Sequence, residues 1–152
     1  MIMKKLLLLS FTLLFPLMAS ADIVCVLAKI NGIYYNLYDK DKTAEVTSYP
    51  NFKYSGEVTI PAAVTYNDSQ YSVTSIGNQV FDGCSELTSV TIPNSIIYIG
   101  QYAFRDCSRL TSITIPNGVT SIESCTFAFC SRLTSVIFPN SITSIGYSAF
   151  AG

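Results

Sequence analysis

The chain has 152 residues, of which 12% are charged, with nine basic residues, ten acidic residues and a formal net charge of −1. This balance leaves no basic patch for nucleic acid and no acidic block. The absence of histidine removes the commonest general base and the commonest metal ligand. The sequence therefore argues against nucleic-acid binding, and it predicts no enzyme activity, no metal site and no cofactor.

The first 21 residues have the pattern of a secretory signal peptide. A positive start is followed by an apolar run over 6–18, and Ala19 and Ala21 fit the small-residue rule for cleavage. The run is shorter than the ~20 residues that a membrane-spanning helix needs. We therefore expect residues 1–21 to be removed on export, which leaves a mature chain that is secreted or held at the cell surface and has no membrane span.

Residues 22–56 carry no copy of the repeat that follows, and they predict a small β-hairpin. Polar and apolar residues alternate over 33–38, a charged turn follows, and a β-favouring run resumes at 43–47. The first rung of a stacked array exposes its apolar interior and a free strand edge, so we expect this hairpin to be an N-terminal cap. A small independent binding domain is the alternative, although roughly 35 residues hold a core poorly.

The rest of the chain, residues 57–152, is one 23-residue unit repeated in tandem. A worn first copy lies at 57–72, three copies lie at 73–95, 96–118 and 119–141, and a partial copy lies at 142–152. The worn copy has nine additional residues around Asn67, which we interpret as a hairpin tip rather than as a glycosylation site. A fixed period of this length is typical of a repeat solenoid, in which each copy forms one coil.

Each copy is predicted to be β-rich, with a strand, a turn, a second extended segment and short helical turns. In the copy at 73–95 the strand is 88–92, a Pro-Asn turn follows, and 78–84 has apolar spacing that suits one or two helical turns. Stacked copies align identical positions, so we expect ladders of core side chains. These are Phe81, Phe104, Phe127, Phe150, Cys84, Cys107, Cys130, Leu87, Leu110 and Leu133.

The cysteine ladder is interpreted as a column of buried thiols, with disulfides as the alternative. Identical positions in neighbouring coils lie roughly 5 Å apart, a separation that by itself permits a disulfide. The column lies among apolar columns, however, where a free cysteine behaves as a small hydrophobe. Cys25 and Cys125 lie outside the column and are either free or paired outside the chain.

Three other columns carry predictions about individual residues. Opposite charges stack between copies, so we expect Asp82 to face Arg105 and Glu86 to face Arg109 on the solvated surface. Glu123 replaces a glycine of the other copies, and it is strained if that position requires a positive φ.

The unit as a whole resembles the BspA-type leucine-rich repeats. The resemblance rests on the run Leu87-x-x-Val90-x-Ile92 and on the recurring Ile-Gly and Ala-Phe-x-x-Cys-Ser-x-Leu-Thr-Ser elements over 57–152. It implies a leucine-rich repeat solenoid and a role in adhesion or protein interaction at the bacterial surface, with no catalytic residues. The chain departs from the usual leucine-rich repeat where serine or glycine replaces the asparagine that follows the strand.

The strand residues that point away from the core are expected to form the binding face. They are Thr88, Ser89, Thr91, Thr111, Ser112, Thr114, Thr134, Ser135 and Ile137. Solenoids use extended faces for partners, so the predicted function is protein interaction or adhesion to host matrix or other cells. Apolar departures from the repeat, such as Ile97, Tyr98, Phe129 and Ile137, are candidate anchors.

Two alternatives remain open for this face. The first is that the regularly spaced threonine and serine side chains bind a glycan or another ordered surface. The second is that the array binds nothing and is a purely structural spacer. The last copy has no recognisable cap. We therefore expect either a continuation of the chain or self-association at that end.

Overall fold

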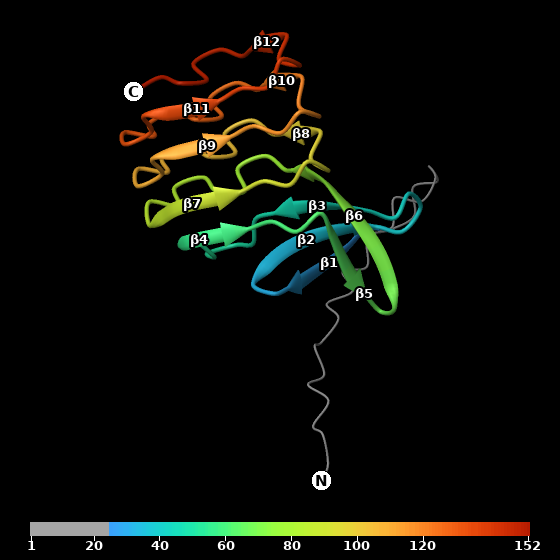
Figure 1. Cartoon of the computed structure of the whole chain (residues 1–152). Helices are drawn as coiled ribbons and strands as arrows, with labels where there is room; N and C mark the ends of the chain where they lie inside the picture. The colour runs from blue at the N-terminus through green and yellow to red at the C-terminus, as the bar shows by residue number, and fades with distance from the viewer. Residues whose placement is uncertain (1–24) are drawn as a thin grey trace, which may run out of the picture.

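The computed structural model describes residues 25–152, so the signal peptide expected at 1–21 lies outside the described residues. The described chain contains twelve β-strands and no helix. The strands are β1 (Cys25–Ile30), β2 (Ile33–Tyr38), β3 (Thr43–Thr47), β4 (Gly56–Thr59), β5 (Ala63–Tyr66), β6 (Ser69–Ile76), β7 (Leu87–Thr91), β8 (Tyr98–Ile99), β9 (Ser112–Thr114), β10 (Ser121–Ile122), β11 (Ser135–Ile137) and β12 (Ser144–Ile145). Figure 1 shows the coils stacked in chain order, with the N-terminal strands at one end. The architecture is a β-rich repeat solenoid.

The N-terminal strands form a sheet that continues into the repeat array. The hairpin expected over 33–47 is present as the antiparallel pair β2 and β3. Strand β3 then pairs in parallel with β6, and β6 pairs in parallel with β8. The first coils therefore share one hydrogen-bonded sheet with the segment that precedes them.

Strand β1 has no counterpart among the predicted elements. It pairs with β2 through a two-residue turn at Asn31 and Gly32, whose φ angles are 49° and 87°. Asn-Gly is the dipeptide that most favours such a turn, because both central residues must adopt positive φ. The signal for this hairpin was therefore present in the sequence.

The additional residues of the first copy form the hairpin β5–β6. Asn67 and Asp68 occupy its tip with φ angles of 46° and 58°, and Tyr66 pairs with Ser69 across it. The turn predicted around Asn67 is confirmed. Strand β4, which precedes this hairpin, pairs in parallel with β7 and so aligns the first copy with the second.

The helical turns predicted at 78–84 and its copies are wrong, because this segment consists of successive turns. The Cys84 N–H donates to the Phe81 carbonyl at 3.0 Å, a bond between residues three apart. Positive φ interrupts any helix twice in each of the three full copies and at Ser148 in the partial copy. The residues concerned are Gln79 (58°), Gly83 (64°), Tyr102 (57°), Asp106 (57°), Cys125 (55°), Phe129 (59°) and Ser148 (52°).

These turns direct backbone N–H groups at the next coil. The donors at 79, 81 and 83 bond the carbonyls of Gln101, Ala103 and Arg105 at 2.8–3.0 Å. The same ladder continues into the two following coils. A helix would consume these donors internally, so the demand for bonding between coils overrides the local apolar spacing.

The phenylalanine column forms a stack of rings through the array. Neighbouring ring centroids of Phe81, Phe104, Phe127 and Phe150 are 5.0, 5.3 and 5.3 Å apart, with interplanar angles of 9–13°. The first three rings are buried. Phe150 remains 40% exposed, because the described chain adds no coil beyond it, and Leu133 is only half-buried. The prediction that Phe150 and Leu133 are core residues is therefore wrong, whereas Leu87 and Leu110 are fully buried as predicted.

Tyr54 extends the ring stack toward the N-terminal sheet. Its ring centroid lies 4.9 Å from that of Phe81, and its hydroxyl donates to the Thr47 carbonyl at 3.0 Å. The Tyr34 N–H donates to the same hydroxyl at 3.0 Å. Tyr54 is thus an amphipathic ring that closes the apolar column and ties it to β2 and β3.

The glycine column at 77, 100 and 146 does not have positive φ, and neither does Glu123. The strain expected at Glu123 from φ therefore does not arise. Glycine suits Gly100 and Gly146 because the backbones of neighbouring coils approach closely there, whereas Glu123 carries a Cβ in the same column. A Cβ added at Gly100 would lie 2.7 Å from the Asn78 nitrogen and 2.8 Å from the Gly77 carbonyl carbon.

We expect Gly100→Ala to lower the free energy of unfolding by roughly 1–3 kcal/mol, because the added methyl group forces two backbones apart. The matched control is Gly77→Ala, whose Cβ meets Glu45 side-chain atoms and the Val46 carbonyl oxygen at 3.1–3.2 Å. Urea denaturation followed by circular dichroism measures both. Equal losses in the two variants would contradict this account.

Candidate functional site

The predicted binding residues lie on one face formed by β4, β7, β9 and β11. Strands β4 and β7 are paired in parallel, as are β9 and β11. Figure 1 shows the four strands in one row along the array. All nine predicted residues are exposed: Thr88, Ser89, Thr91, Thr111, Ser112, Thr114, Thr134, Ser135 and Ile137.

The strand pattern explains why these side chains point outward. Val90 and Ile113 lie on the opposite side of β7 and β9 and are buried in the core. Side chains alternate along a strand, so the residues flanking them face solvent. Ser89, which stands beside the alternation, is also exposed.

The hydroxyl groups of this face are largely unbonded. Within the described part of the chain, only the Thr134 hydroxyl among them forms a hydrogen bond, to the Thr111 carbonyl at 3.3 Å. The corresponding positions of β4 are Glu57 and Thr59, which pair with Ser89 and Thr91. The face therefore offers a row of small donors and acceptors with one carboxylate at its N-terminal end.

A seam interrupts the face between β7 and β9. No backbone hydrogen bond joins these two strands in residues 25–152, although each is paired on its other side. A shallow depression of about 370 Å³ lies over the seam, and its exposed hydroxyls are those of Ser89, Thr91, Ser112 and Thr114. Sequence reasoning did not find this seam, because the two copies involved have nearly the same strand sequence.

The four candidate anchors are exposed but do not form one patch. The exposed fractions are 61% for Ile97, 40% for Tyr98, 55% for Phe129 and 60% for Ile137. Only Ile137 lies on the strand face, in β11. Tyr98 begins β8 on the other side of the coil, and Phe129 lies in the turns.

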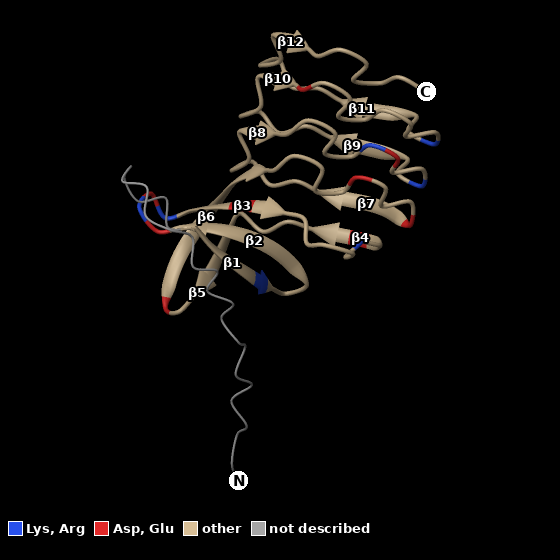
Figure 2. Ribbon diagram, turned by 180° about the vertical axis from the view of Figure 1, so that it is seen from behind, with Lys and Arg blue, Asp and Glu red and all other residues tan. Residues whose placement is uncertain are grey.

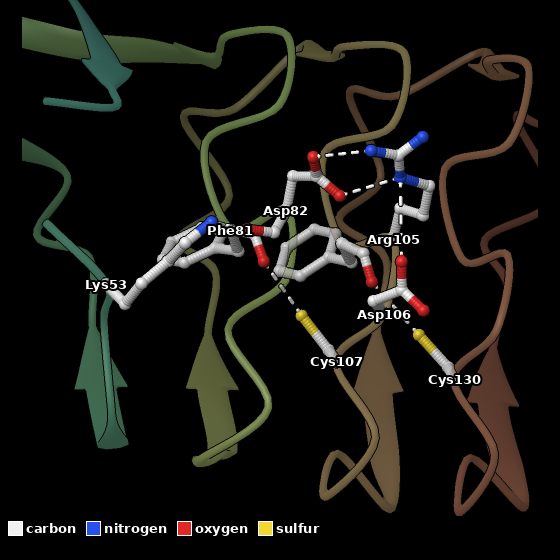
Figure 3. Close-up of polar contacts among 8 residues, drawn as sticks. Lys53, Phe81, Asp82, Arg105, Asp106, Cys107 and Cys130 are labelled. Carbon is white, nitrogen blue, oxygen red and sulfur yellow. Dashed lines mark hydrogen bonds and ion pairs between the residues drawn. The ribbon is translucent and has the colours of Figure 1, made fainter. Parts of the chain in front are cut away.

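Both ion pairs predicted between copies are present. Arg105 binds Asp82 through two bonds of 2.7 and 2.8 Å, and Arg109 binds Glu86 at 2.5 Å. Figure 3 shows the first pair on the turn side of the coil. The Arg109–Glu86 pair is exposed and the Arg105–Asp82 pair is partly buried. Exposed pairs contribute ~0.2–1 kcal/mol each, so we assign these charges to the solvated surface rather than to a site.

The cysteine column consists of buried thiols that are not paired with one another. The Cys107 Sγ donates to the Phe81 carbonyl at 3.1 Å, and the Cys130 Sγ donates to the Phe104 carbonyl at 3.0 Å. Figure 3 shows each thiol pointing toward the preceding coil. The thiol thus donates a hydrogen bond to a backbone carbonyl of the preceding coil. The interpretation of the column as purely apolar missed this role.

Burial also keeps these thiols protonated. It raises the pKa of Cys130 to about 11 and the pKa values of Cys84 and Cys107 above the ordinary value of 9.0. A nucleophilic cysteine requires the opposite shift, because the thiolate is the reactive form. The column is therefore structural and has no features of a catalytic cysteine.

We expect Ellman's reagent to modify two of the five cysteines in the folded protein. Cys25 is exposed and Cys125 is partly exposed, whereas the three column cysteines are buried. All five should react in denaturant without a reducing agent. Fewer than three reactive thiols in denaturant would require a disulfide within the column and contradict the thiol ladder.

The described residues include no helix that is long and apolar enough to cross a membrane.

The match to a known family follows the repeat array. A sequence model described as BspA type leucine rich repeat region matches residues 62–152 in 6 copies. No curated protein is similar enough to the chain to count as a match.

Solved structures of bacterial leucine-rich repeat proteins have the same fold. A leucine-rich repeat protein from Bacteroides ovatus is 41% identical with a TM-score of 0.77, over 82% of this chain and 33% of that protein. One from Bacteroides capillosus is 29% identical with a TM-score of 0.69, over 78% of this chain and 86% of that protein. The leucine-rich repeat protein of T. pallidum is 29% identical with a TM-score of 0.63, over 75% of this chain and 50% of that protein.

This chain thus spans one third of the Bacteroides ovatus protein. The family match covers more than half of the chain and coincides with the stacked coils. This chain belongs to the BspA-type leucine-rich repeat family.

Proposed function

We propose that this protein is exported and binds a protein partner through the strand face of β4, β7, β9 and β11, in adhesion to host matrix or to other cells. The observation that carries the proposal is the extended row of exposed strand side chains whose hydroxyls mostly lack partners in the described chain. Leucine-rich repeat solenoids present such faces for recognition. The signal-peptide pattern of residues 1–21 supports export.

The rigidity of the face favours binding by a preformed surface. The ring stack and the backbone ladder on the turn side hold successive coils in register. Because the face is already ordered, little conformational entropy is lost when a partner binds. We propose in addition that residues 22–56 cap the array, with Tyr54 lying on the first ring of the stack.

A catalytic role is not proposed. The chain contains no histidine, and burial raises the pKa of each column thiol. A general base and an activated nucleophile are the usual requirements for covalent catalysis.

The test is binding of the purified chain to immobilised extracellular-matrix proteins and to bacterial surface proteins, with variants of the strand face. We expect Thr91→Arg with Thr114→Arg to reduce binding at least roughly tenfold, because two long charged side chains block the face. The matched control is Ser85→Arg, since Ser85 is exposed in a turn outside the face.

Absence of binding to every protein in the panel, or equal binding by the face variant and the control, would contradict the proposal. In that case the array is better explained as a structural spacer. Circular dichroism of each variant confirms that the fold is retained.

A glycan is the second candidate ligand, and the depression over the β7–β9 seam favours it. Four exposed hydroxyls border this depression, and its volume of about 370 Å³ is within the range of small-molecule sites. A panel of neutral oligosaccharides tests this alternative. Binding that Thr91→Arg abolishes would support it, and no binding to the panel would leave the protein partner as the better explanation.

A further inference from the structure

The coil has a second solvent-exposed β-face, formed by β6, β8, β10 and β12. Strands β6 and β8 are paired in parallel, as are β10 and β12. Glu45 of β3 pairs with Ser75, and Ser75 pairs with Tyr98. These three residues therefore lie side by side in one row across the N-terminal sheet and the second coil.

The second coil departs from the repeat on this face. Ile97 takes the place that threonine occupies at 74, 120 and 143, and Tyr98 takes the place that serine occupies at 75, 121 and 144. Their exposed fractions are 61% and 40%. Since the other copies stack with a threonine and a serine here, folding does not require two large apolar residues. They are available as contact residues.

A third departure lies beside them. Glu123 occupies the column in which the other copies have glycine, where a Cβ at Gly100 would meet backbone atoms of the preceding coil at 2.7–2.8 Å. A larger residue is thus unfavourable for stacking in this column. The Ser121 hydroxyl donates to Glu123 Oε1 at 2.7 Å and holds the carboxylate on the same face.

A second carboxylate comes from the N-terminal sheet. Side-chain atoms of Glu45 lie over Gly77, 3.1 Å from where a Cβ would stand, and the Asn36 amide donates to Glu45 Oε1 at 3.1 Å. The ion pairs of residues 25–152 involve neither Glu45 nor Glu123. Figure 2 shows acidic residues on β3 and beside β10, with no basic residue between them.

Tyr98 lies one strand away from Glu45, because Ser75 pairs with both residues. Burial raises the pKa of its phenol, and the negative charges of Glu123 and Glu45 raise it further. This electrostatic coupling agrees with the row that the strand register places together. An aromatic ring and two carboxylates that form no ion pair within residues 25–152 therefore lie on the second β-face, and the exposed Ile97 directly precedes the ring in the chain.

We propose that Ile97, Tyr98, Glu45 and Glu123 form a docking site for a basic segment of a partner protein. An arginine of that segment stacks its guanidinium on the Tyr98 ring, where cation–π attraction operates, and bonds the flanking carboxylates. Ile97 supplies apolar contact to the stem of the basic side chain. Charge complementarity selects this occupant, since the acidic surface repels an anionic membrane or nucleic acid.

This site is independent of the strand face, because it lies on the other β-face of the coil. The test is binding of a fluorescent nine-residue Gly/Arg peptide to the purified chain, measured by anisotropy. The variants restore the repeat consensus: Ile97→Thr with Tyr98→Ser, and Glu123→Gly. These replacements are residues that the other copies already accommodate, so the coil should retain its fold.

We expect each variant to weaken peptide binding at least roughly tenfold, with a further loss as salt is raised. Two matched controls are Glu57→Gln, which removes one exposed negative charge elsewhere, and Ile137→Thr, which restores the consensus on the strand face. A Gly/Glu peptide of the same length should not bind.

The proposal is overturned if the Gly/Arg peptide does not bind, if Glu57→Gln weakens binding as much as Glu123→Gly, or if the Gly/Glu peptide binds equally well. The strand-face variants do not change this site, so their effect on matrix binding tests only the proposed function. The peptide assay tests only the docking site, and the two proposals can therefore fail separately.

Discussion

Replacing Phe104 by alanine is expected to lower the free energy of unfolding by about 3–5 kcal/mol. The ring is fully buried and lies between two others, with centroids 5.0 Å from Phe81 and 5.3 Å from Phe127. Its removal opens a cavity at the centre of the stack and deletes both aromatic contacts. Because each coil buries its apolar side chains only against its neighbours, the loss affects both coils that adjoin it.

The matched control is Phe150→Ala, which occupies the same position in the partial copy. Phe150 contacts one ring of the column, Phe127, and is 40% exposed, so its truncation should cost clearly less. Equilibrium urea denaturation, followed by far-ultraviolet circular dichroism and by tyrosine fluorescence, measures both variants. Equal losses would show that the ring stack does not stabilise the array as a column.

Raising the pH above 9 is expected to destabilise the protein through its buried thiols. Burial raises the pKa of Cys130 to about 11 from an ordinary value of 9.0, and it raises that of Cys107 in the same direction. An unfolded thiol ionises above pH 9 while the folded thiol stays protonated. Ionisation therefore lowers the free energy of the unfolded state alone. The contribution of each such thiol to the free energy of unfolding is therefore fully present below pH 9. Above pH 9 the free energy of unfolding falls by roughly 1.4 kcal/mol per pH unit for each thiol until the folded pKa is reached.

The window between pH 9 and 10 isolates the thiols from the buried tyrosines. Burial raises the pKa of Tyr54 to about 12 from 10.0, so that group contributes only at higher pH. The readout is the slope of unfolding free energy against pH, compared between the natural chain and Cys107→Ala with Cys130→Ala. We expect the double variant to lose most of the slope and Cys125→Ala to retain it, because Cys125 lies outside the buried column. A slope unchanged in the double variant would assign the effect to other groups.

Repetition made the array predictable from sequence. Residues 23 apart contact one another in the structure, so the ring column, the ion pairs between copies and the outward strand residues all followed from aligning copies. The alternation around Val90 assigned the exposed side correctly, because side chains on a strand alternate regardless of what lies beyond it. The hairpin tip at Asn67 followed from turn chemistry in the same local way.

The helical turns failed because a local pattern was read without the neighbouring coil. Residues 80, 81 and 84 have apolar spacing that suits a helix, yet the N–H of Phe81 is used by the Ala103 carbonyl of the next coil. The thiol donors of Cys107 and Cys130 have the same origin, since the carbonyls that they bond belong to the preceding coil. No single copy contains this information.

The sequence by itself determined the leucine-rich repeat architecture, the stacked columns and the strand face, because a tandem repeat can bury its apolar side chains only against its own copies. Only the tertiary structure decided how the N-terminal segment joins the array, through β3 pairing with β6 and Tyr54 lying on Phe81. It also brought Glu45 into one row with Tyr98, although 53 positions separate them in the chain. Contacts between a unique segment and a repeated one have no periodic signal, so they depend on the register in which the two meet.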